Sequence, residues 1–418
     1  MTVMNGSAEE TVLELTVAEV AHGGWCVARA EAGPGEGEAG AEAGPGKVVF
    51  VRHALPGERV RAKVTSSTAK FARAEAIEVL TASPDRVEPP CPYAHPGGCG
   101  GCDLQHASPA AQRAIKAQVV SQQLRRIAGI DREVEVAALP GDEDGLGWRT
   151  RVSFAVGRDG TAGLRRHRSR QIAPVADCLI AHPLVRDAKV PGRRWPGARS
   201  VDVTVAPGTG ERSVQVTGRG GPGADSRRHL TQRAAGRTWR VSSGVFWQVH
   251  PAAADTLTAA VLDVLHPQPG DMALDLYCGA GLFAAALAGA VGVTGRVTGV
   301  ESEVAAVRDA RKNLAGFAQV RIHRGDAAEV LERHGPGGAT LAVLDPPRAG
   351  LPGRLIELLA DPAAGLRRVA YVSCDPATLA RDIAVFAGLN WRLDALRAFD
   401  AFPMTHHVEC LATLVPAS

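Results

Sequence analysis

From residue 244 to its C-terminus, the sequence alternates short apolar runs with helix-like segments. Residues 272–277 and 340–344 are apolar runs of strand length, and residues 254–265 have a helical pattern. This alternation predicts an α/β fold with a doubly wound parallel sheet and helices on both faces. In such a sheet, ligands bind outside the carboxyl ends of the strands. The residues that directly follow each apolar run are therefore the first candidates for a functional site.

One of these runs, residues 369–373, stops at a cysteine. Cys374 is followed by Asp375, by Pro376 and by a helix-like segment, residues 377–386. A thiolate is a strong nucleophile, and a neighbouring base or a helix amino-terminus can activate it. The alternative is an inert core cysteine, which is common in strands. This stretch alone does not decide between the two interpretations.

A glycine loop, Gly279-x-Gly281-x-x-Ala284, follows the 272–277 run and opens a helix. Such a loop is compatible with a nicotinamide dinucleotide. Three observations favour S-adenosylmethionine instead. Asp275 precedes the loop, Glu301 ends the next strand where it could hold a ribose diol, and Asp326 ends the third where it could read an adenine amine. The loop has no basic residue to pair with a diphosphate.

The fourth run, residues 340–344, leads directly into Asp345-Pro-Pro-Arg348-Ala-Gly. The prolines make this loop rigid. The Asp345 carboxylate could face either a cationic sulfonium or the polar edge of a flipped base. The alternative interpretation is an ordinary rigid turn.

Residues 11–80 alternate apolar and polar positions in short runs, which is typical of a small antiparallel barrel. The Gly/Pro/Glu/Ala segment 31–46 is expected to be a long flexible loop within it. The layout resembles the TRAM domain, an OB-like module of RNA-modifying enzymes. A basic face that contacts nucleic acid is predicted from Arg29, Lys47, Arg52, Arg61, Lys63, Lys70 and Arg73.

A glycine-rich loop holds three cysteines, Cys91, Cys99 and Cys102. Thiolates at this spacing can surround a tetrahedral zinc ion or an iron–sulfur cluster, and the residue chemistry does not decide between the two. Cys178 is the candidate for the fourth ligand. His95 lies inside the loop and is expected to face solvent.

The segment from Trp148 to Arg170 contains seven arginines and one acid, Asp159. Guanidinium groups match phosphate geometry, so this segment predicts contact with an RNA backbone. The alternative is a solvated charged face. The net charge of the whole chain is only +3, so charge distribution carries this inference.

The sequence is expected to divide into a disordered tail (1–10), the barrel (11–80), the cysteine loop with a helix (81–130), a small central β domain that binds RNA (131–243) and the α/β domain (244–418). No apolar run approaches the length of a membrane span, and the first residues lack the pattern of a signal peptide. We therefore expect a cytoplasmic protein without a membrane partner. A monomer is also expected.

Five motifs in one order resemble the RNA uridine-5-methyltransferase family of the RumA/TrmA type, which has a Rossmann-like class I methyltransferase domain. They are Phe246-Trp-Gln248-Val-His, Asp275-Leu-Tyr277-Cys-Gly279-Ala-Gly281, Asp345-Pro-Pro-Arg-Ala-Gly, Ser373-Cys374-Asp-Pro and Phe402-Pro-Met-Thr-His-His-Val-Glu409. The resemblance extends over nearly the whole chain. Members that modify ribosomal RNA carry a TRAM domain and a 4Fe-4S cluster.

The resemblance implies a role for each matched residue. Cys374 would be the nucleophile and Glu409 the base. The methyl donor or the target base would contact Gln248, Tyr277, Gly279, Gly281, Glu301, Asp326 and Asp345, and a 4Fe-4S cluster would be bound by Cys91, Cys99, Cys102 and Cys178. Two departures are the longer Cys91–Cys99 gap and Leu282, which stands where several relatives have asparagine.

The implied reaction is methylation of carbon 5 of a uridine. Addition of a thiolate to carbon 6 would activate carbon 5, and a carboxylate would then remove its proton. The preferred substrate is 23S ribosomal RNA, and the alternative is the T-loop uridine of transfer RNA. The distant alternatives are a dinucleotide-dependent iron–sulfur oxidoreductase and an inactive RNA-binding module.

Overall fold

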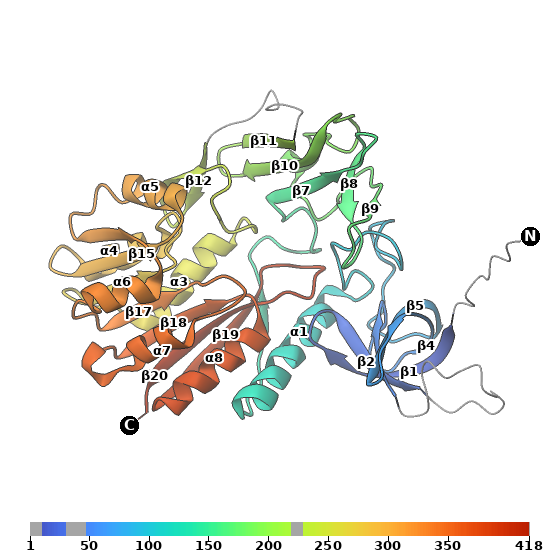
Figure 1. The fold of residues 1–418 in the computed structure, drawn as a ribbon, viewed down its shortest axis with the longest axis horizontal. Coiled ribbons are helices and arrows are strands. Elements are labelled where there is room, and N and C mark those ends of the chain that lie inside the picture. Colours follow the sequence, from blue (N-terminus) through green and yellow to red (C-terminus); the bar gives the residue numbers. More distant parts are fainter. Residues whose placement is uncertain (1–10, 31–46, 219–228, 418) are drawn as a thin grey trace, which may run out of the picture. The chain divides into compact units, whose positions relative to one another are not determined.

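The computed structural model describes residues 11–30, 47–218 and 229–417 (Figure 1). They form two compact units. The first consists of Met1–Ile115, Arg165–Ala173 and Met404–His406, and the second of Lys116–Leu164, Pro174–Pro403 and His407–Ser418. The predicted tail at 1–10 and the predicted loop at 31–46 lie outside the described residues.

A closed five-stranded barrel forms most of the first unit, with the strand order β1-β2-β3-β5-β4. Alternate residues point inward, so that Val49, Val51, Ala72 and Ala74 are fully buried. The prediction of an OB-like barrel is confirmed, but the barrel is not wholly antiparallel, because β3 and β5 pair in parallel. Its strands are β1 (Val12–Ala21), β2 (Trp25–Ala30), β3 (Val48–Arg52), β4 (Arg59–Ser67) and β5 (Phe71–Thr81).

An eight-stranded sheet organises the second unit, in the order β16-β15-β14-β17-β18-β20-β19-β6. The first five strands of this order are parallel, and β20 is antiparallel to both of its neighbours. The predicted doubly wound sheet is confirmed. The strands are β14 (Met272–Leu276), β15 (Arg296–Glu301), β16 (Val320–Arg324), β17 (Leu341–Leu344), β18 (Arg368–Ser373), β19 (Trp391–Asp400), β20 (Glu409–Pro416) and β6 (Val136–Ala138).

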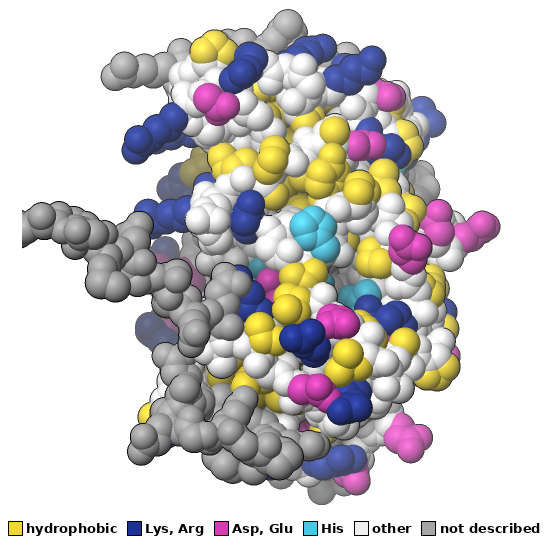
Figure 2. All heavy atoms as spheres, turned by 90° about the vertical axis from the view of Figure 1, so that its right-hand side faces the viewer, with side chains coloured by type: hydrophobic (Ala, Val, Ile, Leu, Met, Phe, Trp, Pro, Cys, Tyr) yellow, Lys and Arg dark blue, Asp and Glu magenta, His cyan; other side chains and the backbone are white. Residues whose placement is uncertain are grey.

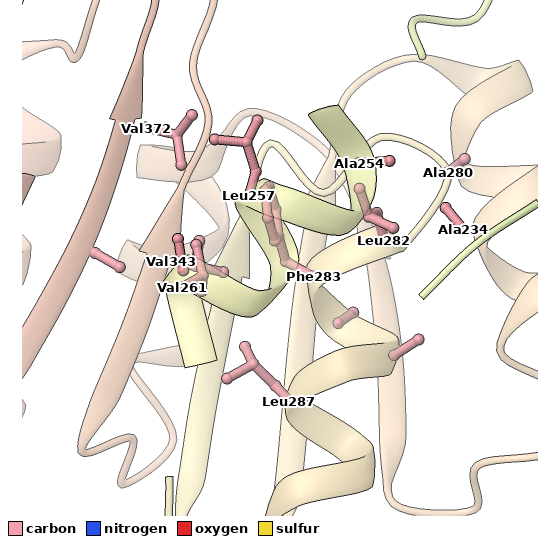
Figure 3. Close-up of a cluster of buried hydrophobic side chains, with 14 of the residues drawn as sticks. Ala234, Ala254, Leu257, Val261, Ala280, Leu282, Phe283, Leu287, Val343 and Val372 are labelled. Carbon is pink, nitrogen blue, oxygen red and sulfur yellow. The ribbon is translucent and has the colours of Figure 1, made fainter. Parts of the chain in front are cut away.

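Helices cover both faces of this sheet. Successive residues of a strand point to opposite sides, so a strand that is apolar throughout has to be buried on both. Val343 of β17 packs with α3 (Ala253–Leu265), α4 (Leu282–Val291) and α5 (Val304–Asn313). Figure 3 shows Leu257 and Val261 of α3 beside Phe283 of α4 in this core. The next residue, Leu344, belongs to the opposite core. That core contains α6 (Ala327–His334), α7 (Gly353–Ala360), α8 (Pro376–Gly388) and the C-terminal part of α1 (Pro109–Gln123).

The chain also forms smaller β elements, which belong to the second unit except for Arg165 and residues 172–173. A five-stranded sheet has the order β11-β10-β7-β8-β9, and β12 pairs with β13 in a hairpin. The strands are β7 (Arg151–Val156), β8 (Ala162–Arg165), β9 (Ile172–Ala173), β10 (Ala198–Ala206), β11 (Glu211–Gly218), β12 (His229–Ala234) and β13 (Arg237–Ser242). The remaining short helices are η2 (Leu124–Ala128), α2 (Pro183–Arg186) and η3 (Pro362–Ala364). Among the described helices, none is long and apolar enough to cross a membrane.

Truncation of Phe283 tests the packing of the α3–α4 face. Its side chain is 4% exposed, so Phe283→Ala should lower the free energy of unfolding by about 3–5 kcal/mol, measured by urea denaturation. Val293→Ala is the control, because Val293 is 89% exposed and its change should stay within about 0.5 kcal/mol. A loss for Phe283→Ala of under about 1 kcal/mol would contradict this packing.

Candidate active site

The strand register brings two predicted catalytic residues to one edge of the sheet. In the antiparallel pairing of β18 with β20, Ser373 lies opposite Cys410. Continuing that register by one residue places Cys374 opposite Glu409, the first residue of β20. Asp345 follows β17, whose Leu344 is paired in parallel with Tyr371 of β18. Cys374, Glu409 and Asp345 therefore converge at the carboxyl edge of the parallel strands.

All three groups have raised pKa values. Burial, followed by the nearby Glu409 and Asp345 carboxylates, raises the pKa of Cys374 to about 11, with Arg348 opposing. Burial and the Asp345 charge raise the pKa of Glu409 well above its usual range. Burial of the Asp345 carboxylate, in a residue that keeps some solvent exposure, raises its pKa to about 7. Activation of Cys374 by the helix amino-terminus stays a prediction.

Arg348 is the basic group that counteracts this accumulation of acids. Its charge and its hydrogen bond lower the pKa of the Cys374 thiol, and its charge also lowers the pKa of Glu409. Its guanidinium Nη2 lies 3.1 Å from Nε2 of His407. The sequence motif contained Arg348, but only the three-dimensional contacts reveal its proximity to Cys374.

Helix α8, which begins directly after Cys374, holds the 345–350 loop. Asp375 caps this helix by accepting from the Thr378 amide at 2.8 Å. Thr378 Oγ1 donates to the Arg348 carbonyl at 3.1 Å, and Arg381 Nη2 donates to the Ala349 carbonyl at 2.8 Å. One helix thus begins beside Cys374 and holds the loop that carries Asp345 and Arg348.

Gly350 has to be glycine in this arrangement. Its φ is 77°, and an added Cβ would lie 2.3 Å from Thr378 and 2.5 Å from Asp382. Asp382 is buried, and accepts from the Leu351 amide at 2.9 Å and from the Tyr371 hydroxyl at 2.7 Å. The loop and helix α8 are therefore in direct contact.

The glycine loop after β14 forms a second part of the same sheet edge. Tyr277 has a φ of 64°, which is unusual for a residue with a side chain. Gly281 has a φ of 95°, and a Cβ there would lie 2.7 Å from Leu314. The Gly279 amide donates to Glu301 Oε2 at 3.0 Å, so this loop and the end of β15 are linked.

Acidic groups surround the glycine loop. Burial raises the pKa of Tyr277 to about 12, with further contributions from nearby Asp326, Asp382 and Glu301. Asp326 caps α6, accepting from the Ala328 amide at 2.9 Å. Tyr277, Glu301 and Asp326, which were predicted separately, are therefore close together. Gln248 is buried in the segment before α3, and its assignment as a binding residue stays a prediction.

Asp275, next to this loop, has a buried carboxylate that lacks hydrogen-bond donors among the described residues. It is completely buried, and neither carboxylate oxygen accepts a hydrogen bond of normal geometry from the described residues. Burial raises its pKa to about 8. The Ala284 amide approaches it and lowers the value slightly, whereas Asp345 and Glu301 raise it. A ligand with cationic groups would relieve this accumulation of acids.

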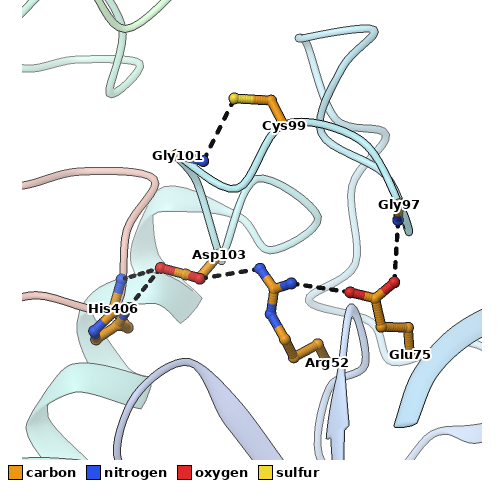
Figure 4. Close-up of polar contacts among 7 residues, drawn as sticks. All are labelled: Arg52, Glu75, Gly97, Cys99, Gly101, Asp103 and His406. Carbon is orange, nitrogen blue, oxygen red and sulfur yellow. Dashed lines mark hydrogen bonds and ion pairs between the residues drawn. The ribbon is translucent and has the colours of Figure 1, made fainter. Parts of the chain in front are cut away.

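The cysteine loop lies in the first unit and is organised by hydrogen bonds (Figure 4). The Gly101 amide donates to Cys99 Sγ at 3.4 Å, and the Gly97 amide donates to Glu75 at 3.0 Å. His95 is exposed, as predicted. No group of three or more His, Cys, Asp and Glu side chains in the described part of the chain could hold a metal ion.

The metal prediction therefore gains no support from the geometry. Cys91, Cys99 and Cys102 all belong to the first unit, yet they are not arranged as a ligand set there. Cys178 belongs to the second unit. The 4Fe-4S cluster and its zinc alternative stay predictions from the sequence.

The predicted basic face is partly wrong. Arg52 is 2% exposed and is used internally, where it donates to Glu75 at 3.0 Å and to Asp103 at 3.2 Å (Figure 4). The space-filling view shows Lys and Arg interspersed with Asp and Glu (Figure 2). A defined basic cluster does exist in the first unit, where the guanidinium groups of Arg73 and Arg168 lie 5.9 Å and 5.8 Å from the centre of the Trp25 ring.

The arginine segment packs against the cysteine loop within the first unit. The Gly100 amide donates to the Arg165 carbonyl at 3.0 Å. A Cβ on Gly100 would lie 2.2 Å from the His167 backbone nitrogen, so the two segments are in tight contact. Arg165, Arg166 and Arg168 themselves are exposed.

Comparison with known proteins identifies the family. A model described as tRNA (Uracil-5-)-methyltransferase matches residues 339–415, a TRAM domain model matches residues 7–77, and a protein-L-isoaspartate O-methyltransferase model matches residues 246–360. An uncharacterized RNA methyltransferase of Streptomyces avermitilis is 48% identical over 97% of this chain and 98% of its own. The 23S rRNA (uracil(1939)-C(5))-methyltransferase RlmD of Acinetobacter baylyi is 32% identical over 88% of each chain.

The chain belongs to the RNA uracil-5-methyltransferase family. It is an RNA methyltransferase that depends on S-adenosylmethionine. The Pyrococcus abyssi tRNA (uracil-54, C5)-methyltransferase has the same fold, with a TM-score of 0.67 and 24% identity over 88% of this chain and 96% of its own. The resemblance inferred from the five motifs is confirmed.

The methyl donor fits the acidic loop region of this methyltransferase. S-adenosylmethionine carries a sulfonium and an ammonium group, and the unsatisfied Asp275 carboxylate belongs to a site that favours positive charge. Glu301 and Asp326 could accept hydrogen bonds from the adenosine. Asp275 was noted in the sequence only as a motif residue, because its burial and its lack of partners depend on the folded structure.

The protonation of Asp275 should make the stability of the ligand-free methyltransferase depend on pH. Its pKa is raised from 3.8 to about 8, so the folded state binds the proton more tightly, and the free energy of unfolding should fall as the pH rises through this window. The two pKa values set an upper limit of about 6 kcal/mol on this loss. Asp275→Asn should reduce the difference between urea denaturation at pH 5 and pH 8.

Glu357→Gln is the control for this measurement, because Glu357 is exposed on α7. Its substitution should leave the pH dependence as in the parent protein. An Asp275→Asn variant with the full parental pH dependence would show that other groups cause it.

Proposed function

We propose that this protein methylates carbon 5 of a uridine in RNA, and that its substrate is 23S ribosomal RNA. The observation that carries the proposal is the placement of Cys374 opposite Glu409 at the carboxyl edge of a methyltransferase sheet. Two relatives that are named as 23S rRNA methyltransferases RlmD support ribosomal RNA as the substrate. The Acinetobacter baylyi protein is 32% identical to this chain, and the Acidithiobacillus ferrooxidans protein is 33% identical.

The first step is nucleophilic addition. Carbon 5 of uracil is a poor nucleophile, so the ring has to be activated before it can accept a methyl group. The Cys374 thiolate forms a bond to carbon 6, and the electron pair of the 5,6 double bond moves into an enolate. Because the pKa of Cys374 is raised, the Arg348 guanidinium has to stabilise the thiolate at this step.

The second step is methyl transfer. S-adenosylmethionine supplies an electrophilic methyl group on a positively charged sulfur. Carbon 5 of the enolate attacks this methyl group in line, and the neutral thioether leaves. Asp345, at the edge between the glycine loop and Cys374, would face either the donor or the uracil.

The third step removes the proton from carbon 5. Glu409 accepts it, the carbon 5–carbon 6 double bond forms again, and the Cys374 thiolate is expelled. The burial of Glu409 raises its pKa, which makes it a stronger proton acceptor than an exposed carboxylate once it is ionised. A base in such a pocket has to be flipped out of its stack, and this costs least in unpaired RNA.

The second candidate substrate is transfer RNA. The solved transfer RNA enzyme of Pyrococcus abyssi shares the fold at 24% identity, which bears on the fold alone. Methyl transfer to unmodified transcripts of 23S ribosomal RNA and of transfer RNA would separate the two candidates. Methylation of the ribosomal transcript, with little on the transfer RNA, is the expected result, and the reverse would favour the second candidate. The monomeric state and the iron–sulfur cluster are not part of this proposal.

Substitutions of the two catalytic residues should stop the reaction at different points. Cys374→Ala should abolish both methylation and covalent RNA adduct, because carbon 5 is never activated. Glu409→Gln should accumulate a methylated adduct, because addition and methyl transfer precede proton removal. Denaturing electrophoresis with a donor labelled in the methyl group would show this adduct as a labelled protein–RNA band.

Normal product release by Glu409→Gln would mean that another group is the base. A labelled band from Cys374→Ala would contradict the assignment of the nucleophile.

The arginine segment should contribute to RNA affinity through phosphate contacts. Replacement of Arg165, Arg166 and Arg168 by alanine should weaken RNA binding. The fall of log K with log salt should become less steep by up to about 2, because each lost contact to single-stranded RNA removes roughly 0.7 from the slope. A triple alanine variant of the exposed Arg308, Arg333 and Arg392 is the matched control. Equal slopes for the two variants would show that the arginine segment is an ordinary solvated charged face.

A further inference from the structure

His407 lies two residues before Glu409, and its ring contacts Arg348. The distance between His407 Nε2 and Arg348 Nη2 is 3.1 Å. A guanidinium can only donate hydrogen bonds, so His407 Nε2 has to be the acceptor. The ring is then neutral and carries its proton on Nδ1.

Arg348 is held at its backbone by helix α8 and at its tip by His407. Thr378 fixes the Arg348 carbonyl at 3.1 Å. The side chain itself is exposed. A free arginine side chain samples many rotamers and carries about 2 kcal/mol of rotamer entropy. The hydrogen bond to His407 therefore favours one direction of the guanidinium group.

The direction of this guanidinium matters to the catalytic pair. Arg348 is the basic group that lowers the pKa values of both Cys374 and Glu409. Its effect on the thiol includes a hydrogen bond, which depends on orientation as well as on distance.

The ring of His407 also packs against an aromatic side chain. It meets the Phe402 ring edge-on, with 5.9 Å between the ring centres. The Phe402 carbonyl accepts from Lys116 Nζ at 3.0 Å, and Lys116 forms a buried ion pair with Asp400 at 2.5 Å. The ring position is therefore fixed through a buried lysine of α1.

We propose that His407 is a positioning residue, which accepts a hydrogen bond from Arg348 and so holds the guanidinium against Cys374. The inference rests on the proposed role of Cys374 as the nucleophile. His407 does not touch the uridine or the methyl donor in this account. It acts by keeping the thiolate stabilised while the carboxylates of Glu409 and Asp345 lie nearby.

Two substitutions distinguish this role from simple packing. The amide of glutamine reaches about as far as Nε2 of histidine, so His407→Gln can keep an acceptor for Arg348. The amide of asparagine reaches only about as far as Nδ1, so His407→Asn cannot. The probe is iodoacetamide, and the readout is the rate of alkylation of the Cys374 peptide across pH, followed by mass spectrometry in the full-length protein without RNA.

His407→Asn should lower the alkylation rate at pH 7.5 about tenfold, equivalent to a pKa of Cys374 raised by about one. His407→Gln should stay within about threefold of the parent. In methyl transfer assays, His407→Asn should lower kcat and leave the KM for the donor unchanged. His229→Asn, which changes an exposed histidine of β12, is the matched control and should behave as the parent.

The proposal is overturned if His407→Asn keeps the parental alkylation profile, or if His407→Gln is impaired as severely as His407→Asn in a protein with the parental unfolding transition. Because alkylation requires no RNA, its outcome is independent of the proposed function. A shifted profile in a protein that methylates no uridine would refute the proposed function and leave the His407–Arg348 relationship standing.

Discussion

The antiparallel pairing of β20 with β18 is the constraint on which the site depends. The strands from β16 to β18 in the sheet order all pair in parallel, and a parallel strand at the position of β20 would present its carboxyl end beside Cys374. The reversed direction of β20 instead presents its first residue, Glu409, at the edge where β18 ends. The proposed nucleophile and the proposed base, which are 35 positions apart in the sequence, are thus brought together across the two strands.

This arrangement has an electrostatic consequence. Asp275 and Glu409 are buried acids, Asp345 is partly buried, and all three have raised pKa values, as does the Cys374 thiol. The site in the absence of ligand therefore disfavours the negative charges that the chemistry needs. Positive charge, from Arg348 and from the bound methyl donor, restores them.

Much of this site could be predicted from the sequence, because its residues follow strands that have clear apolar patterns. Cys374 and Asp345 stand directly after such runs, and Glu301 is the last residue of one. The role of Arg348 could not be predicted, because its partner His407 is 59 positions away. Likewise, Arg52 has the charge of a surface residue and is buried by its pairing with Asp103 and Glu75.

Some features of the fold also lie beyond sequence patterns. β6 has only three residues, which is too short for any periodicity, and it joins the main sheet through β19. The arginine segment is interrupted between β8 and β9, and the turn between these two strands belongs to the first unit. Its tight contact with Gly100 explains this interruption, since it depends on a glycine more than sixty positions earlier.

The most direct test of the account is to map the covalent intermediate on an RNA that contains 5-fluorouridine. Fluorine on carbon 5 cannot be removed as a proton, so the reaction should stop after methyl transfer. Mass spectrometry of the digested complex should then find a nucleotide that carries both the fluorine and the new methyl group on the peptide containing Cys374. A nucleotide on another cysteine, or an adduct at Cys374 that never gains the methyl group, would contradict the account.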